Sequence, residues 1–243
     1  MSGHSRWAGI KHKKGAIDAK RGKVFTRIIR EMTIAARAGG GNPDNNPRLR
    51  TVIEEAKAAN MPGDNVKKAI QRGTGEIPGV TFEEISYEGY GTGGAAVMLT
   101  GTTDNKNRTT SEIRKIFSSH GGNMGESGCV AWNFSAKGSL IVEKSAFADE
   151  EKLIGIALDA GAEDVKSDSP DHFEILTAPG DLAKVKAALS GAGIAVASAE
   201  TAMIPGTTVA LTGGDAERML ALLEALEEHD DVKDVYSNCE IKE

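Results

Sequence analysis

The chain has 243 residues, of which 40% are hydrophobic, and a formal net charge of -6 at pH 7. This length exceeds the roughly 100 to 150 residues of one typical domain, so it predicts two or three compact units. The sequence has no apolar run of the roughly 18 residues that a membrane helix needs, no apolar signal segment near its start, and only Cys129 and Cys239 as cysteines. These features argue against a membrane-spanning or a disulfide-rich secreted protein, and we expect a cytoplasmic one.

Charge divides the chain near Gly75. Residues 1–75 hold sixteen Lys or Arg and six Asp or Glu, a net charge of +10, whereas residues 76–243 hold thirteen and twenty-nine, a net charge of -16. A molecule polarised in this way attracts polyanions to one end and repels them from the other. The charge pattern therefore indicates a nucleic-acid partner for the N-terminal third.

The N-terminal third begins with a glycine- and lysine-rich stretch, residues 1–22, that has few aliphatic side chains and is predicted to be a mobile basic arm. Apolar residues at helical spacing then predict a helix over residues 23–38, which the Gly39–Gly41 run ends. A second helix is expected after Asn46 and Pro47, and a short third helix from Asp64 or Asn65 to Gly73. Together these helices predict a three-helix domain.

Beyond Gly75, short β-branched runs alternate with helical patterns, which predicts an α+β multidomain protein. In chain order we expect strands at 82–87 and 95–100, a helix at 108–119, strands at 129–134 and 139–142, a helix at 149–160, strands at 163–166 and 172–177, a helix at 181–190, strands at 194–199 and 208–211, a helix at 216–228 and a strand at 232–236. The middle set spells a complete βαββαβ unit, and the outer elements complete an interrupted one. We therefore predict two ferredoxin-like βαββαβ domains, one inserted in the other.

The predicted domains are residues 1–78, a basic helical domain with its N-terminal arm; residues 79–135 plus 205–243, a split α/β domain; and residues 136–204, an inserted ferredoxin-like domain.

Motifs that are typical of enzymes and cofactor sites are better explained in this sequence as ordinary structural features. Gly89, Gly91 and Gly94 match the spacing G-x-G-x-x-G, but AAVMLT follows as a strand where a dinucleotide site needs a helix, so a hairpin turn is expected. GESGC around Ser127 lacks the last glycine of a nucleophile elbow. The five histidines show no metal-ligand spacing, and the acidic pairs fit solvated faces. We predict no catalytic residue, no metal and no cofactor.

The basic residues have a pattern that points to function. On the first helix Lys20, Lys23, Arg27, Arg30 and Arg37 fall on one arc, opposite an apolar arc that includes Phe25, Ile28 and Met32, so one face packs and the other forms a cationic stripe. The predicted nucleic-acid-binding set adds Trp7, which could stack on a base, to the cations of the arm and of the first and third helices. Its members are Arg6, Trp7, Lys11, His12, Lys13, Lys14, Lys20, Arg21, Lys23, Arg27, Arg30, Arg37, Lys67, Lys68 and Arg72.

Long stretches of the chain carry a family resemblance. They are GHSRWAGIKHKKGAIDAKRGKVFTRIIREMTIAARAGGGNPDNNPRLR, AKAANMPGDNVKKAIQRGTGE, YEGYGTGG, TDNKNRT and SSHGGNMGESGCVAW. With these the chain closely resembles the YebC/PmpR family over essentially its whole length. The resemblance implies three domains, no enzymatic activity and DNA-binding regulation of transcription. For some relatives it implies translation instead, as mitochondrial translational activators or as factors for ribosomes stalled at proline-rich stretches.

Three functions stay open at this point. The first is a DNA-binding regulator, although no helix-turn-helix spacing is clear in the sequence. The second is an RNA- or ribosome-associated translation factor, which an arm that orders on contact would suit. The third is an adaptor that binds proteins through its acidic α/β domains. Phosphate contacts position a protein without naming the nucleic acid, so the basic residues do not choose between the first two.

Overall fold

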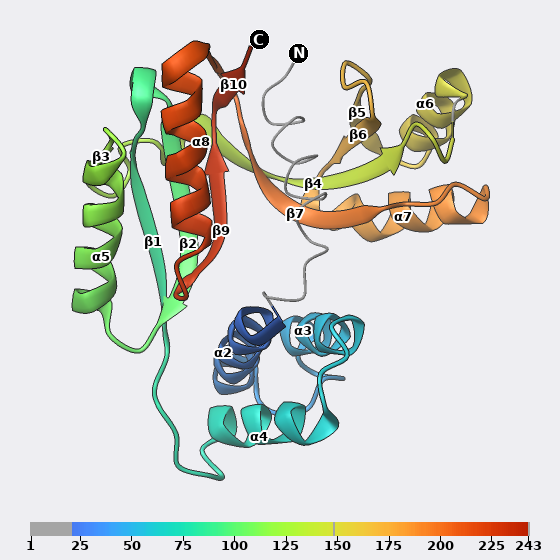
Figure 1. Ribbon diagram of the computed structural model, residues 1–243. Helices are drawn as coiled ribbons and strands as arrows, with labels where there is room; N and C mark the ends of the chain where they lie inside the picture. Colours follow the sequence, from blue (N-terminus) through green and yellow to red (C-terminus); the bar gives the residue numbers. More distant parts are fainter. Residues whose placement is uncertain (1–20, 148, 243) are drawn as a thin grey trace.

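A computed structural model describes residues 21–147 and 149–242, which are arranged as a helical unit below two sheet-containing units (Figure 1). The helical unit contains α2 (Arg21–Gly39), α3 (Pro47–Ala58) and α4 (Gly63–Thr74). They share one core, to which Ile28 and Met32 of α2, Leu49 of α3 and Ala69 of α4 contribute. The three-helix arrangement predicted from the apolar spacing is confirmed, and the cap of α4 is Pro62 rather than Asp64 or Asn65.

Two residues fix how these helices meet. At Gly73 of α4 an added Cβ would lie 2.5 Å from the carbonyl oxygen of Thr33 and 2.6 Å from the Cβ of Ala36, so α4 approaches α2 where only glycine fits. Asn46 is buried between α2 and α3. Its Nδ2 donates to the carbonyls of Ala35 and Gly40, at 2.8 and 2.9 Å, and its Oδ1 accepts from the first turn of α3. One side chain therefore ends α2 and begins α3.

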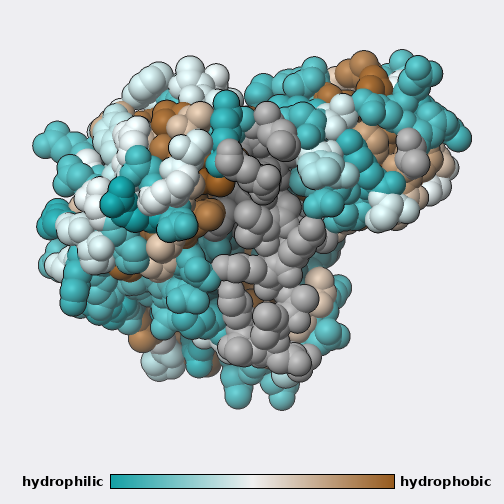
Figure 2. All heavy atoms as spheres, turned by 45° about the horizontal axis from the view of Figure 1, so that its top comes forward, coloured by the Kyte–Doolittle hydropathy of each residue, from teal (hydrophilic) through white to brown (hydrophobic). Residues whose placement is uncertain are grey.

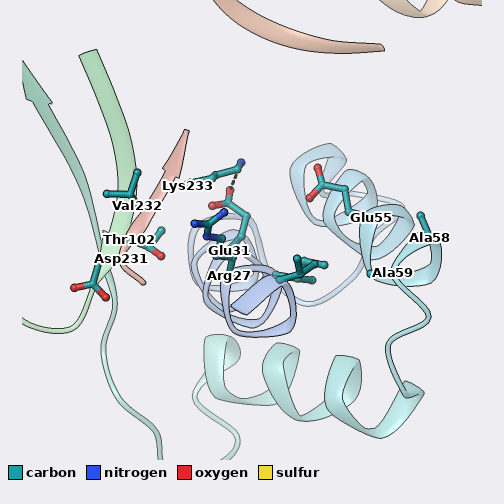
Figure 3. Close-up of a pocket in the computed structure, with 11 residues that line it drawn as sticks. Arg27, Glu31, Glu55, Ala58, Ala59, Thr102, Asp231, Val232 and Lys233 are labelled. Carbon is teal, nitrogen blue, oxygen red and sulfur yellow. Dashed lines mark ion pairs between the residues drawn. The ribbon is translucent and has the colours of Figure 1, made fainter. Parts of the chain in front are cut away.

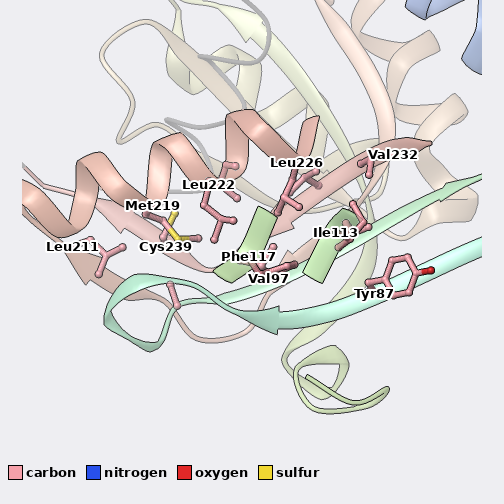
Figure 4. Packing of buried hydrophobic residues seen from close by; sticks show 14 of the residues in the cluster. Tyr87, Val97, Ile113, Phe117, Leu211, Met219, Leu222, Leu226, Val232 and Cys239 are labelled. Atoms are coloured by element: carbon pink, nitrogen blue, oxygen red, sulfur yellow. The ribbon is translucent and has the colours of Figure 1, made fainter. Parts of the chain in front are cut away.

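The split unit is an antiparallel sheet with two helices on one face. Its strands are β1 (Glu83–Tyr90), β2 (Ala96–Thr103), β3 (Asn123–Met124) and β9 (Val232–Ser237), in the order β3-β1-β2-β9, and its helices are α5 (Lys106–Ser119) and α8 (Gly213–Glu227). Figure 4 shows side chains of both helices meeting those of the sheet, among them Phe117 of α5, Leu222 of α8 and Val97 of β2. A short parallel pair, β8 (Val209–Leu211) and β10 (Cys239–Ile241), joins this core.

The inserted unit has a second antiparallel sheet. Its elements are β4 (Phe134–Glu143), α6 (Glu150–Asp159), β5 (Ala162–Lys166), β6 (His172–Thr177), α7 (Leu182–Gly191) and β7 (Ser198–Pro205), and its strand order is β5-β6-β4-β7. This is the βαββαβ order predicted from the sequence. Leu140, Phe173 and Leu189 lie in the core between the sheet and the two helices.

In the split unit the order of helices and strands along the chain differs from a second βαββαβ pattern. Before the insertion the chain forms β1, β2, α5 and β3, and after it β8, α8, β9 and β10. The layers are those of the predicted α+β class, but β1 and β2 pair directly as a hairpin from Glu83–Thr103 to Tyr90–Ala96.

The glycine-rich turn of this hairpin includes Gly93 at φ 69° and Gly94 at φ 76°. The hairpin expected from the G-x-G-x-x-G match is therefore confirmed.

Two predicted strands are misplaced. Residues 129–133 form no strand, because the buried carboxylate of Glu88 accepts the backbone N–H groups of Gly128, Val130 and Ala131 at 2.7 to 2.8 Å and holds this segment as a turn. The strand expected at 194–199 begins at Ser198 instead. Ile194 is apolar because it caps α7: its N–H donates to Leu189 O and its side chain enters the core.

Exposed hydrophobic side chains are scattered over the described surface. Figure 2 shows them on one face as small patches among hydrophilic residues. The large ones that are exposed are Val24, Val80, Tyr90, Trp132 and Leu158. Within residues 21–147 and 149–242, no helix has the length and apolar content needed to cross a membrane.

Asn46 gives a test of the helical unit. Replacement of Asn46 by Ala removes the cap of α3 and leaves the buried carbonyl of Ala35 without this donor, so we expect the free energy of unfolding to fall by about 1 to 3 kcal/mol. Urea titration followed by circular dichroism measures the change. Asn45→Ala is the matched control, because Asn45 is exposed and makes a backbone hydrogen bond that the substitution keeps. Equal stabilities of the two variants would contradict the role of Asn46.

Candidate nucleic-acid interface

Seven of the fifteen residues predicted to bind nucleic acid lie outside the part of the chain that the structure describes. These are Arg6, Trp7, Lys11, His12, Lys13, Lys14 and Lys20. Arg21 is the first residue of α2. The remaining members divide between two helices, Lys23, Arg27, Arg30 and Arg37 on α2 and Lys67, Lys68 and Arg72 on α4.

The α4 residues form an exposed cationic face. Val66, Ala69, Ile70 and Gly73 turn toward α2, which leaves Lys68 and Arg72, four residues apart, on the opposite side of the helix and Lys67 beside them. All three side chains are exposed. Among the described residues none of the three has an ion-pair partner. We call Lys67, Lys68 and Arg72 the α4 face.

The cations of α2 are placed differently, because they contact the end of α8 and the residues after it. This segment, which we call the acidic corner, is residues 227–231 with the sequence Glu-Glu-His-Asp-Asp. Lys23 Nζ donates to Glu228 O at 2.8 Å and lies 3.5 Å from an Asp230 carboxylate oxygen. Arg27 Nη2 donates to Glu227 O at 2.5 Å. The stripe predicted on α2 is therefore not a free surface at these positions.

Arg30 makes the deepest of these contacts. Its Nη1 lies 2.5 Å from Asp231 Oδ1 and also donates to the carbonyls of Asp230 and Thr102, at 3.0 and 3.2 Å. Its guanidinium carbon lies 5.5 Å from the centre of the Phe82 ring, within the range of a cation–π contact. Arg30 thus joins the helical unit to β2 and to the residues just before β9.

Asp231 is the common acceptor at this junction. The side chain is 3% exposed, and its Oδ2 accepts from Thr109 at 2.6 Å, Arg108 at 2.8 Å and Thr103 at 3.0 Å. Burial by itself raises the pKa of a carboxyl group, but these hydrogen bonds and the one from Arg30 outweigh burial and lower the pKa of Asp231 to about 2. The carboxylate is therefore charged at neutral pH and fully used by its neighbours.

Further contacts cross the same junction at its rim. Arg48 of α3 bonds to Glu31 of α2 at 2.5 Å and to Glu84 of β1, and Lys233 of β9 lies 3.9 Å from Glu31. Arg37, the remaining predicted residue of α2, is exposed, and its Nη1 donates to Phe82 O at 3.4 Å. The α2 helix is consequently flanked by charged side chains on both sides.

A pocket of about 420 Å³ opens between the helical and the split units beside these contacts. Figure 3 shows Arg27 and Glu31 of α2 facing Lys233, while Glu55 and Ala58 of α3 and the next residue, Ala59, line the other side. A second, more polar hollow of about 710 Å³ lies on the other side of the Arg30 contact, between α5 and the acidic corner. The junction is thus made by a few polar groups with space on either side.

The predicted set leaves out several cations, because it takes its members only from the arm and from the first and third helices. Lys57 of α3 is exposed in the last turn of that helix, and Arg50 is exposed while its guanidinium holds Pro43 O and Asp44 O. The α5 helix lies in the acidic half but exposes Lys106, Arg114 and Lys115. A count of the charges on every predicted helix, rather than on the two parts of the chain divided at Gly75, would have found both groups.

The described residues offer no cluster of three or more His, Cys, Asp or Glu side chains that could hold a metal ion. The chemistry that the described basic surface provides is the donation of N–H groups and positive charge to oxygen acceptors, which suits phosphate.

Asp231 gives a prediction that depends on pH. A carboxyl group whose pKa falls from 3.8 to about 2 on folding adds stability above about pH 4, and loses this contribution as the pH falls toward 2. We expect Asp231→Asn to lower the free energy of unfolding by about 2 to 3 kcal/mol at pH 7, and the difference from the parent to shrink between about pH 4 and pH 2.

Urea titrations at several pH values measure this difference. Asp215→Asn is the control, because Asp215 forms an exposed pair with Arg218 on α8 and its loss should change stability by less than about 1 kcal/mol. A deficit of Asp231→Asn that stayed constant down to about pH 2 would show that its carboxylate charge is not what stabilises the fold.

Comparison with known proteins places this geometry in a family. Residues 5–76 match the TACO1/YebC protein N-terminal domain, and residues 82–239 match the TACO1/YebC second and third domain. The boundary between the two matches falls at the segment that joins α4 to β1.

Similar proteins extend over the whole chain. A probable transcriptional regulatory protein of Pelotomaculum thermopropionicum is 58% identical, over 100% of both chains, and one of Dictyoglomus turgidum is 55% identical, over 99% of this chain and 96% of the relative. The crystal structure of a conserved hypothetical protein from Aquifex aeolicus superposes with a TM-score of 0.85 at 48% identity, covering 98% of each chain. The chain belongs to the TACO1/YebC family.

Proposed function

We propose that this protein is a non-enzymatic regulator of gene expression that binds DNA through the helical unit. The observation that carries the proposal is the α4 face: Lys67, Lys68 and Arg72 are exposed on one side of a helix and lack ionic partners within the described residues. Relatives named probable transcriptional regulatory proteins support the regulatory part of this proposal.

The position of α4 favours a nucleic-acid duplex as the partner. Four residues, 59–62, join α3 to α4, and α4 lies at the outer edge of the molecule with the sheet-containing units on the other side of α2 (Figure 1). A short connection between two packed helices, the second of which is exposed and cationic, is the arrangement by which many proteins present a helix to DNA. Lys and Arg side chains along that helix would contact phosphate.

The charge of the sheet-containing part of the chain also supports binding of a duplex on the side of the helical unit. The net charge of -16 over residues 76–243 repels a polyanion, so a duplex would approach from the side of the helical unit. RNA, including ribosomal RNA, presents the same phosphate groups, and an RNA target is therefore an outcome that the experiment below separates from DNA. An adaptor that binds proteins through its acidic units would need no α4 face.

The test removes the three cations of the α4 face together. We expect Lys67→Gln/Lys68→Gln/Arg72→Gln to weaken DNA binding about 10- to 100-fold near 0.1 M salt, and to make the log-log salt dependence shallower by about 2 to 3, because each lost phosphate contact removes about 0.9 from the slope. Fluorescence anisotropy over a range of salt concentrations measures both quantities, with a DNA duplex and a single-stranded RNA as separate probes.

The matched control is Lys152→Gln/Lys184→Gln/Lys186→Gln, three exposed cations of the inserted unit whose removal changes the net charge equally. The control should bind like the parent. If RNA binding alone depends on the α4 face, the RNA alternative replaces DNA. If neither probe binds more weakly to the α4 variant than to the control, nucleic-acid binding by this face is wrong, and the adaptor becomes the better description.

A further inference from the structure

The geometry of α2 points to a second site for phosphate. We propose that Lys23, Arg27 and Arg30 form a covered phosphate-binding surface, which the acidic corner occupies in the closed protein and which nucleic acid takes over when it displaces the corner. This inference rests on the proposed function and adds a form of regulation to it. The acidic corner competes with nucleic acid for the cations of α2.

The acidic corner meets these cations with the chemistry that phosphate would offer. The last carbonyl groups of α8 carry the negative end of the helix dipole. Two oxygens at this end, Glu227 O and Glu228 O, accept from Arg27 at 2.5 Å and from Lys23 at 2.8 Å. The carboxylates of Asp230 and Asp231 add full negative charges at 3.5 Å from Lys23 and 2.5 Å from Arg30. Oxygen acceptors that carry negative charge are also what a phosphate group offers to Lys and Arg side chains.

The buried carboxylate of the corner keeps three of its four hydrogen bonds without α2. When Arg30 leaves, Asp231 Oδ2 keeps its hydrogen bonds from Thr103, Thr109 and Arg108, all of which belong to the split unit. The α2 cations, in contrast, lose their acceptors, and a phosphate group can replace them. Opening therefore removes the hydrogen bond that Asp231 Oδ1 accepts from Arg30, while Oδ2 keeps its three donors and the released cations can pair with phosphate.

Part of the junction separates at low cost, and the main cost lies in the buried Arg30–Asp231 pair, with 13% and 3% of the two side chains accessible. The Lys23–Asp230 pair is largely exposed, with 47% and 68% of the two side chains accessible, and such pairs contribute little to stability. The two hollows beside the contact show that apolar packing does not hold the units together here. Val24, which lines the smaller hollow, is itself exposed.

The connection between the units would allow the movement. The α4 helix ends at Gly75, at φ 81°, and β1 begins at Glu83. Most of the intervening residues are exposed, and Figure 1 shows this segment as an extended connection without helix or strand. The helical unit can therefore swing away from the acidic corner without unfolding a helix or a strand, as is usual for units joined by a small polar interface.

A covered surface lowers the apparent affinity of the whole protein, because only the open fraction binds with all its cations. The test removes two of the four carboxylates of the corner and leaves every cation in place. In Glu228→Gln/Asp230→Asn both altered side chains are exposed and Asp231 keeps its donors, so the fold is retained, which equal melting temperatures check. We expect this corner variant to bind a DNA duplex and a single-stranded RNA about 3- to 10-fold more tightly than the parent at fixed salt.

A control separates release of the cations from a general loss of negative charge. Glu126→Gln/Glu217→Gln removes the same charge from exposed positions of the split unit outside the acidic corner, and should change the affinity less than about 2-fold. Lys23→Gln/Arg27→Gln/Arg30→Gln is then combined with the corner variant and with the parent. We expect the triple change to lower affinity more in the corner variant, since in the parent it also releases the closed contact.

The outcomes distinguish this inference from the proposed function. Corner and control variants that bind equally, or a triple change with the same effect in both backgrounds, would overturn the covered site. The α4 variant, measured in the same assay, tests the proposed function separately. Loss of binding in the α4 variant together with equal corner and control variants leaves the proposed function standing and removes the covered site. Full binding by both the α4 and the α2 variants removes both.

Discussion

The buried carboxylate of Asp231 is the constraint on which the contact between the helical and the split unit depends. A charged carboxylate at 3% exposure is tolerated when its neighbours supply hydrogen bonds, and here they come from β2, α5 and α2. The backbone of Asp231 adds a further tie, because its carbonyl accepts the N–H of Thr102 at 2.8 Å. Gly101 lies so close to this carbonyl that an added Cβ would stand 2.0 Å away. The start of β9, the end of β2 and the first turns of α5 are therefore fixed together by one residue.

The same residue determines what the basic helix can do. The cations on one side of a helix can be paired in two ways, with an external polyanion or with acceptors of the same protein. In this protein α2 uses internal acceptors at Lys23, Arg27 and Arg30, while α4 leaves Lys67, Lys68 and Arg72 exposed. Position explains the difference, since Lys23, Arg27 and Arg30 lie against the acidic corner of the split unit, whereas α4 lies on the far side of α2 from the sheet-containing units.

Local patterns in the sequence predict most of the helices and strands, because these elements depend on neighbours along the chain. The spacing of Ile28 and Met32 predicts α2, Asn46 predicts the start of α3, and the alternation of helices and short strands predicts the inserted βαββαβ unit. The strand predicted at 129–134 fails for the opposite reason. Its backbone N–H groups are taken by Glu88, about forty residues earlier, and nothing in the local pattern reveals that partner.

The interface shows the same limit more strongly. Helical spacing correctly places Lys23, Arg27 and Arg30 on one side of α2, but their acceptors lie about 200 residues later in the chain. Sequence patterns report the side of a helix, and only tertiary structure reports what covers it. The run Glu-Glu-His-Asp-Asp at 227–231 is an ordinary solvated helix end in the sequence, yet in the fold it is the counterpart of the basic stripe. Opposite charges at the two ends of a polarised chain are thus as much a signal of contact within the molecule as of an external partner, and a cationic helix should be weighed against every acidic segment of its own chain before its partner is taken to be nucleic acid.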